Sequence, residues 1–191
     1  MQRRDLLKMI VAATGTSIVG SYAFAYDQLP SESLANTKFT PKEAAFMNEV
    51  GELIIPKTTT PGAKDANVGV MMSIIVSDCY TNQQQSTFKQ GLKAIDDLSK
   101  AQFGQSFIQC KKTDKQALIA SLDKQAKEHI KNNQPSGQGE GSHYFTMIKQ
   151  LVIFTFFTSK VGATEVLRHV AIPGSYDGEL PYKKGDRAWS R

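Results

Sequence analysis

The sequence predicts a mostly α protein: a single helical-bundle domain with an extended N-terminal arm and an irregular C-terminal arm. Five segments between residues 40 and 160 carry apolar residues at helical spacing. Three of them begin with Thr followed three residues later by Glu or Gln, the pattern of a helix capping box. Proline and glycine clusters separate the segments. With 191 residues and 40% hydrophobic side chains, the chain is long enough for one core.

The chain opens on a hexamer, RRDLLK, that is typical of a signal for the twin-arginine export route. This route carries proteins that are already folded, usually around a cofactor. It predicts a periplasmic location, with membrane association only through a partner. An ordinary secretory signal with a chance pair of arginines is the alternative. The residues of the predicted signal motif are Arg3, Arg4, Leu6, Leu7 and Lys8.

The rest of this segment fits a removable signal better than a membrane anchor. The apolar run from 9 to 20 is shorter than the ~20 apolar residues that a membrane-spanning helix needs. Ala23-Phe24-Ala25 is an A-x-A cleavage site, so we expect the mature chain to begin at Tyr26. The predicted division is therefore a twin-arginine signal over residues 1–25, a helical domain over 26–169 and an extended arm over 170–191.

The net charge argues against a nucleic-acid partner. Removal of the signal takes away three basic residues and one acidic residue, so Lys+Arg falls from 23 to 20 and Asp+Glu from 18 to 17, which leaves +3 instead of +5. The remaining lysines are scattered among acidic and amide side chains, without the basic stripe that nucleic-acid binding requires.

The first two predicted helices flank a loop rich in threonine. Thr40 caps the first helix and Pro56 ends it. In the loop, Pro61-Gly62 is a turn signal, and Asp65 or Asn67 caps the second helix, over about residues 68 to 80. The buried positions predicted for these two helices are Phe46, Val50, Leu53, Ile54, Met71, Ile74, Ile75 and Cys79.

Three more helices follow. Thr81 caps the third, which Gly104 closes, and Thr113 caps the fourth. After a linker over residues 132–141, Ser142 caps a fifth helix that is apolar almost all round and therefore belongs at the centre of the bundle. The buried positions predicted for the third and fourth helices are Phe88, Leu92, Ile95, Leu98 or Ser99, Ile119, Leu122, Ala126 and Ile130.

The C-terminal arm contains aromatic residues that disordered segments usually lack, namely Tyr176, Tyr182 and Trp189. We therefore expect it to lie on a surface, either its own or a partner's. A short turn over residues 162–164 leads towards it.

The side chains that carry chemistry are few, and the sequence predicts no catalytic, cofactor-binding or metal-binding residue. The only glycine cluster, GQGEGS, follows a polar linker rather than a strand, so it does not match a dinucleotide-binding loop. Haem, iron–sulfur and zinc sites need more cysteine and histidine ligands than this chain groups together. We interpret His129, His143 and His169 as surface residues. A catalytic triad assembled in space stays open.

The two cysteines, Cys79 and Cys110, leave three alternatives. An exported protein can form a disulfide, and a bond between them would close a loop of about 30 residues and contribute ~3.5 kcal/mol in the chain-entropy model. That bond needs a taut return of the chain after the third helix. A bond to a partner chain and free thiols are the other two alternatives.

Four stretches resemble the gluconate 2-dehydrogenase subunit 3 family: GELIIPKTTTPGAKDANV followed by SDCY, then FTSKVGATEVL, PGSYDGELPY and GDRAW. The resemblance runs from Phe46 to Trp189. Members are small subunits of exported flavin-dependent sugar and sugar-acid dehydrogenases. The resemblance implies a non-catalytic partner of a large glucose-methanol-choline type subunit that holds FAD and oxidises the substrate, often with a cytochrome c subunit to accept electrons. It also implies an export escort, because the large subunit commonly lacks a signal.

We predict the contacts with that partner in the threonine-rich loop and in the C-terminal arm. A plain turn at Pro61-Gly62 and docking of Trp189 on the protein's own core are the alternatives. An independent periplasmic enzyme or ligand-binding protein stays open, as does a small subunit that adds one residue to a shared active site. The substrate is open, because specificity belongs to the large subunit. The predicted interface residues are Pro61, Gly62, Tyr176, Asp177, Gly178 and Trp189.

Overall fold

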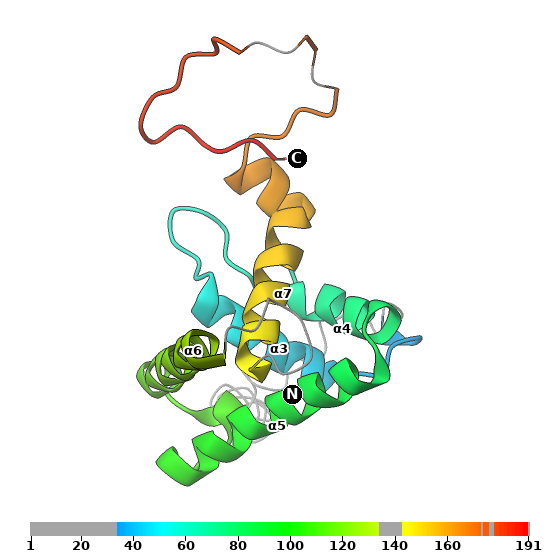
Figure 1. Cartoon of the computed structure of the whole chain (residues 1–191), viewed down its shortest axis with the longest axis vertical. Helices are drawn as coiled ribbons and strands as arrows, with labels where there is room; N and C mark the ends of the chain where they lie inside the picture. The colour runs from blue at the N-terminus through cyan, green and yellow to red at the C-terminus, as the bar shows by residue number, and fades with distance from the viewer. Residues whose placement is uncertain (1–33, 134–142, 173, 176–177, 191) are drawn as a thin grey trace, which may run out of the picture.

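The computed structural model describes residues 34–133, 143–172, 174–175 and 178–190. Most of these residues are helical, and the only β pairing among them is a single bridge, which confirms the mostly α prediction. The predicted signal, with its motif and cleavage residues, lies outside the described residues. In Figure 1 the helices gather around the lower part of α7, and the C-terminal arm forms an open loop beyond the far end of that helix.

The helices follow one another with short connections. None of those in the described residues is long and apolar enough to cross a membrane. In chain order they are α3 (Pro41–Ile54), α4 (Val68–Cys79), α5 (Asn82–Phe103), the 3₁₀ turn η1 (Phe107–Gln109), α6 (Lys112–Asn133), α7 (Tyr144–Thr158) and the π-helical turn η2 (Gly162–Val166).

The predicted helix ends are largely confirmed. The hydroxyl of Thr40 accepts a hydrogen bond from the Glu43 backbone N–H, and the Glu43 carboxylate accepts one from the Thr40 N–H at 2.8 Å. Thr81 forms the same capping box at the start of α5. Gly104 closes α5 in the left-handed conformation, with φ of 70°. Helix α6 starts at Lys112, one residue before the predicted cap Thr113.

The start of α4 is capped from another helix, contrary to the prediction. Asn67 occupies the cap position in the left-handed conformation, and its side chain makes no capping bond. Instead, Asn48 of α3 accepts a hydrogen bond from the Gly69 N–H at 2.7 Å and donates one to the Asn67 side chain at 2.8 Å. The other predicted candidate, Asp65, bonds within the preceding loop. The cap therefore joins α3 to α4.

The buried face of α4 also differs from the predicted one. Met71 and Cys79 are exposed, and Ile74 and Ile75 are half-buried. Apolar residues occur all around this helix, so hydrophobicity alone could not select a face. Gly69 selects it, because the absence of a side chain there allows the backbone of α3 to approach closely. The buried residues of α4 are Val68, Gly69, Val70, Met72, Ser73 and Val76.

The last described part of the predicted N-terminal arm is anchored on the bundle. The backbone N–H of Thr37 donates to the Leu34 carbonyl at 2.9 Å, which makes a turn. Leu34 and Phe39 are buried in the core, where the Phe39 ring packs edge-on against Phe88. Residues 26–33 lie outside the described residues.

Helix α7 is the central helix, as predicted. It contacts α3, α4, α5 and α6. Its N-cap is His143, while the predicted cap Ser142 lies outside the described residues. Its buried side chains are Phe145, Thr146, Met147, Ile148, Leu151, Val152, Thr155 and Phe156.

Candidate functional site: the exposed face of α7 and the C-terminal arm

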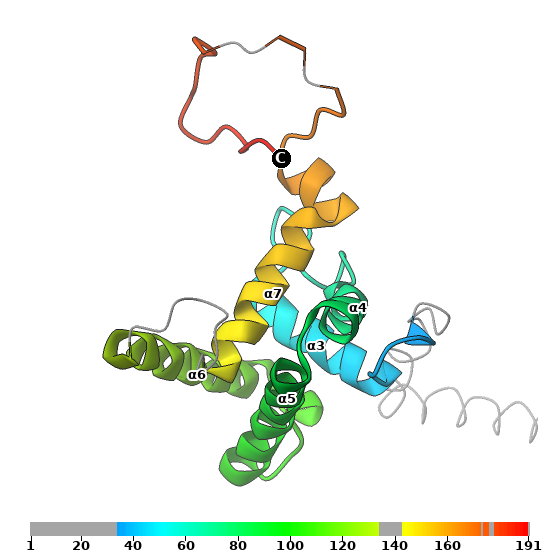
Figure 2. The same cartoon turned by 45° about the vertical axis from the view of Figure 1, so that its right-hand side comes forward.

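One face of α7 is not covered by the bundle. The C-terminal half of the helix extends past α5 and α6 (Figures 1 and 2). Three apolar side chains there stay exposed, with Phe154 at 56% the most accessible. The helix is central, as predicted, but its apolar residues are not buried on all sides in this half. We call Ile153, Phe154 and Phe157 the α7 stripe.

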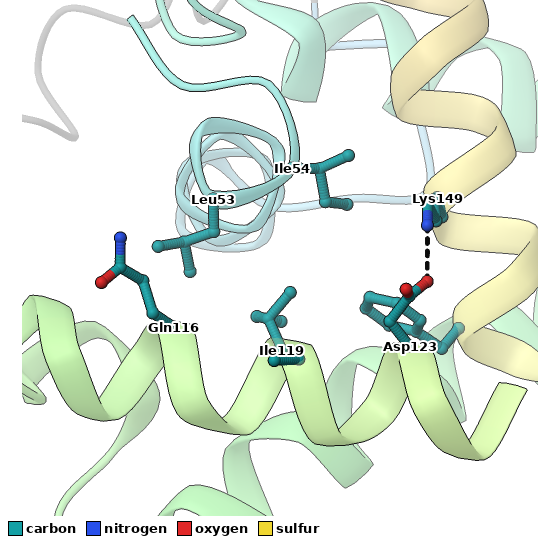
Figure 3. Close-up of a pocket in the computed structure, with 8 residues that line it drawn as sticks. Leu53, Ile54, Gln116, Ile119, Asp123 and Lys149 are labelled. Carbon is teal, nitrogen blue, oxygen red and sulfur yellow. Dashed lines mark hydrogen bonds and ion pairs between the residues drawn. The ribbon is translucent and has the colours of Figure 1, made fainter.

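A hollow of about 360 Å³ lies beside the other half of α7, between α3 and α6 (Figure 3). Its apolar lining comes from Leu53, Ile54, Ile119 and Phe145. Lys149 follows Phe145 by one helical turn, and Ile153 follows Lys149 by another, so the hollow leads towards the α7 stripe. We call it the α7 hollow.

An ion pair borders the α7 hollow (Figure 3). The Lys149 ammonium lies 2.5 Å from one Asp123 oxygen, and Lys127 lies 2.7 Å from the other. Hydrogen bonds from Lys127 and Lys149 lower the pKa of the Asp123 carboxyl. Because its charge is already matched by two lysines, Asp123 is suited to holding α6 against α7 rather than to acid–base chemistry.

The C-terminal arm is closed at its base by a contact that we call the clasp. The Arg168 N–H donates to the Ala188 carbonyl and the Ser190 N–H donates to the Arg168 carbonyl, both at 2.8 Å. The Arg168 guanidinium lies over the Trp189 ring, 4.6 Å from its centre. Trp189 therefore packs on the base of the arm and not on the core, which excludes one of the two alternatives for it.

Between its two ends the arm stands away from the bundle (Figures 1 and 2). Its apolar side chains are accordingly accessible, with Ile172 exposed by 87% and Tyr182 by 77%. Gly178, a predicted interface residue, is exposed as well, whereas Tyr176 and Asp177 lie outside the described residues. These apolar side chains of the arm are therefore open to contact with a partner.

The threonine-rich loop between α3 and α4 is more ordered than a plain turn. The Glu52 carboxylate accepts a hydrogen bond from the Lys64 N–H at 3.0 Å, and the Gly62 N–H donates to Asp65 at 2.9 Å. A Cβ atom on Gly62 would lie 2.6 Å from a Glu52 carboxylate oxygen. Gly62 is buried and shapes the loop, so Pro61 is the member of this predicted pair with accessible surface.

The two cysteines are not bonded to each other. Cys79 is exposed at the end of α4, whereas Cys110 is buried. The Cys110 sulfur lies 3.0 Å from the Ser99 hydroxyl, inside the contact between α5 and the segment after η1. Of the three alternatives for these thiols, the structure does not have the intrachain disulfide.

His143 has a structural role that its interpretation as a surface residue did not include. Its Nδ1 atom accepts a hydrogen bond from the Phe145 N–H at 3.2 Å, so a neutral imidazole caps α7. The ring stacks on Tyr144, and the His129 ring of α6 lies 5.8 Å away. Burial, followed by the nearby His129, lowers the pKa of His143. Its place just before a long apolar run was the signal available in the sequence.

We expect acid to weaken the fold partly through His143. Its pKa is lowered from 6.5 in the folded chain, so the unfolded chain takes up the proton first. The stabilisation that the neutral His143 gives to the fold is fully present above the pKa of His143 in the unfolded chain. It is lost as the pH falls below that pKa. The free energy of unfolding in urea should therefore fall less between about pH 8 and about pH 5 for His143→Asn than for the original protein. Asparagine keeps a cap but does not titrate. An equal loss in both proteins would show that the cap does not titrate in this range.

The arrangement suits binding better than catalysis. Among the residues that the structure describes, no group of three or more His, Cys, Asp or Glu side chains is placed to hold a metal ion. What the site offers is an apolar stripe, a hollow edged by an ion pair and a projecting arm. The fold and the site thus define an α-helical protein with apolar side chains that stay accessible on one face of α7 and on the arm.

The comparison with protein families identifies the family to which this α-helical protein belongs. Residues 41–174 match the model described as Gluconate 2-dehydrogenase subunit 3. The match covers more than half of the chain, so the chain belongs to the gluconate 2-dehydrogenase subunit 3 family. Searches of the curated proteins and of the solved structures gave no match. The matched range includes the whole bundle and α7, and it ends before most of the arm.

Proposed function

We propose that this chain is the non-catalytic small subunit of a periplasmic, flavin-dependent dehydrogenase of the glucose-methanol-choline type that acts on sugars or sugar acids. Its role is to escort the FAD-bearing large subunit through export and to stabilise it. The observation that carries this proposal is the family match over residues 41–174. The family is described as subunit 3 of gluconate 2-dehydrogenase, and a subunit implies a complex with other chains.

The α7 stripe and the arm supply the contact with the large subunit. Aromatic and aliphatic side chains at the centre of an interface usually contribute most of its binding energy. The C-terminal end of α7 and the arm lie at the same end of the molecule (Figure 1), and Phe154 on α7 and Tyr182 on the arm are both accessible. The α7 hollow can take an apolar side chain of the partner next to the stripe.

The division of labour within the complex is what the family resemblance implies. FAD and the substrate belong to the large subunit, and a cytochrome c subunit accepts the electrons where one is present. The twin-arginine motif at Arg3 and Arg4 explains how a cofactor-loaded large subunit without its own signal reaches the periplasm. This chain therefore adds the export address and an apolar surface, not a reacting group.

A periplasmic pull-down tests this proposal. The chain is tagged at its C-terminus and expressed in its own host, and the visible spectrum and subunit masses of the eluate are recorded. We expect a flavin spectrum and a stoichiometric large chain. Changing Arg3 and Arg4 to Lys should leave both chains in the cytoplasm. A colourless eluate with one folded chain would contradict the proposal and favour an independent ligand-binding protein that uses the α7 hollow.

A further inference from the structure

A second groove lies on elements that do not form the α7 stripe. It runs between the N-terminal part of α3, the middle of α5 and η1, and its volume is about 500 Å³. Phe46, Leu92 and Ile108 provide its apolar floor. Leu92 is buried and the other two are half-buried, so the floor is recessed. We call it the lysine groove, for the residues on its rim.

Three ammonium groups surround this apolar floor: Lys42 of α3, and Lys89 and Lys93 of α5. Lys42 and Lys93 are exposed, and neither forms an ion pair within the part of the chain that the structure describes. Lys89 is half-buried; it donates to the Lys38 carbonyl and lies 4.8 Å from the centre of the Phe39 ring. Among the described residues, none of the three has a carboxylate partner.

The two acidic residues of the groove are already engaged elsewhere. Glu43 completes the capping box of α3 through the Thr40 N–H and hydroxyl. Asp96 accepts a hydrogen bond from the Phe107 N–H at 2.9 Å and pairs with Lys100 at 2.5 Å. Because Lys100 matches the charge of Asp96, the three lysines face the single remaining carboxylate of Glu43, and the rim carries net positive charge over an apolar floor.

We propose that the lysine groove binds an acidic amphipathic helix from another chain of the same complex. A groove between two helices is a common receptor for a helix that inserts apolar residues at i, i+3 or i+4, and i+7. The amines of Lys42 and Lys93 then pair with Asp or Glu at the edge of that helix. A flat surface would not reach the recessed floor, whereas side chains projecting from a helix do. This inference rests on the proposed function, since it needs the complex to exist.

Lysine footprinting of the purified complex tests the groove. The lone chain and the complex are treated with an acetylating reagent, and each lysine is followed by mass spectrometry. We expect the reactivity of Lys42 and Lys93 to fall about fivefold or more in the complex, while that of Lys131, an exposed lysine at the end of α6, changes less than about twofold. A carbodiimide, which joins amines directly to carboxylates, should link Lys42 or Lys93 to Asp or Glu of one partner helix.

Paired variants separate charge from fold. Lys42→Glu with Lys93→Glu should raise the dissociation constant of the complex about tenfold or more and reduce its dependence on salt. Lys42→Arg with Lys93→Arg should bind normally but lose the carbodiimide links. The matched control, Lys124→Glu with Lys131→Glu, changes the same charge away from the groove and should bind within about twofold of the original.

The outcomes distinguish this inference from the proposed function. If the complex forms but Lys42 and Lys93 stay as reactive as in the lone chain, the groove is not an interface and the proposed function still stands. If the variant with Lys42→Glu and Lys93→Glu binds normally, the groove is likewise not an interface and the proposed function still stands. If no complex forms, the proposed function fails. Carbodiimide links from Lys42 or Lys93 to an acidic loop without helical spacing would contradict the proposal that the partner segment is a helix.

Discussion

Replacing Gly69 with alanine should destabilise the fold by about 3 kcal/mol or more, a large effect for a single added methyl group. A Cβ atom at position 69 would lie 2.0 Å from the Ala44 carbonyl oxygen and 2.9 Å from its carbon. Both are backbone atoms of α3, so no side-chain rotation can relieve the clash. Helix α4 would have to move away from α3, which would break the bond between the Gly69 N–H and Asn48.

Urea unfolding followed by far-UV circular dichroism measures this loss. The matched control is Gly174→Ala, because no atom lies within 4 Å of a Cβ added there. That variant should unfold within about 0.5 kcal/mol of the original protein. Similar stability of Gly69→Ala and Gly174→Ala would show that α3 and α4 do not pack as closely as the structure has them.

The starts and ends of most helices could be predicted because local chemistry determines them. The Thr40 and Thr81 capping boxes depend on residues three apart, and the positive φ of Gly104 is a property of one residue. The cap of α4 could not be predicted in this way. Its donor and acceptor are Gly69 and Asn48, 21 residues apart, and only the packing of α3 on α4 brings them together.

The buried faces were harder to predict where apolar residues surround the helix. On α4 the absence of a side chain at Gly69 selects the packed face, and a count of hydrophobic residues gives a glycine no weight. On α7 the composition predicts burial on all sides, but burial also requires a neighbouring element. In the C-terminal half of this helix the bundle buries Val152, Thr155 and Phe156 but leaves Ile153, Phe154 and Phe157 exposed. The position of the neighbouring elements, not the sequence of α7 itself, decides which face stays exposed.

The candidate site could be predicted only in part, because much of it depends on contacts between residues far apart in the sequence. The aromatic content of the arm pointed to a surface contact, and Trp189 does lie at a contact, with Arg168 of its own chain. The clasp joins residues 168 and 189 across the whole arm, so it follows from no local pattern. The apolar sequence of α7 does not reveal that Phe154 and Phe157 are exposed, because their exposure depends on what surrounds the helix.

Replacing Phe154 with aspartate should raise the dissociation constant of the proposed complex by about 30-fold or more, equivalent to about 2 kcal/mol. The side chain is 56% exposed in the lone chain, so its loss should cost little folding free energy. In the complex the change removes an aromatic anchor and places a carboxylate in an apolar contact, where it has no partner. The two effects add in the same direction. Titration of the tagged variants with the purified large subunit measures the change.

The matched control for this variant is Ile130→Asp, at the C-terminal turn of α6. Ile130 is 41% exposed, similar to the members of the α7 stripe, but it belongs to neither the stripe nor the hollow. It should bind the large subunit within about threefold of the original protein. If Phe154→Asp folds normally by circular dichroism and still binds as tightly as Ile130→Asp, the α7 stripe is not the contact surface. A loss confined to Phe154→Asp would instead mean that the end of α7 left uncovered by the bundle is covered by the partner.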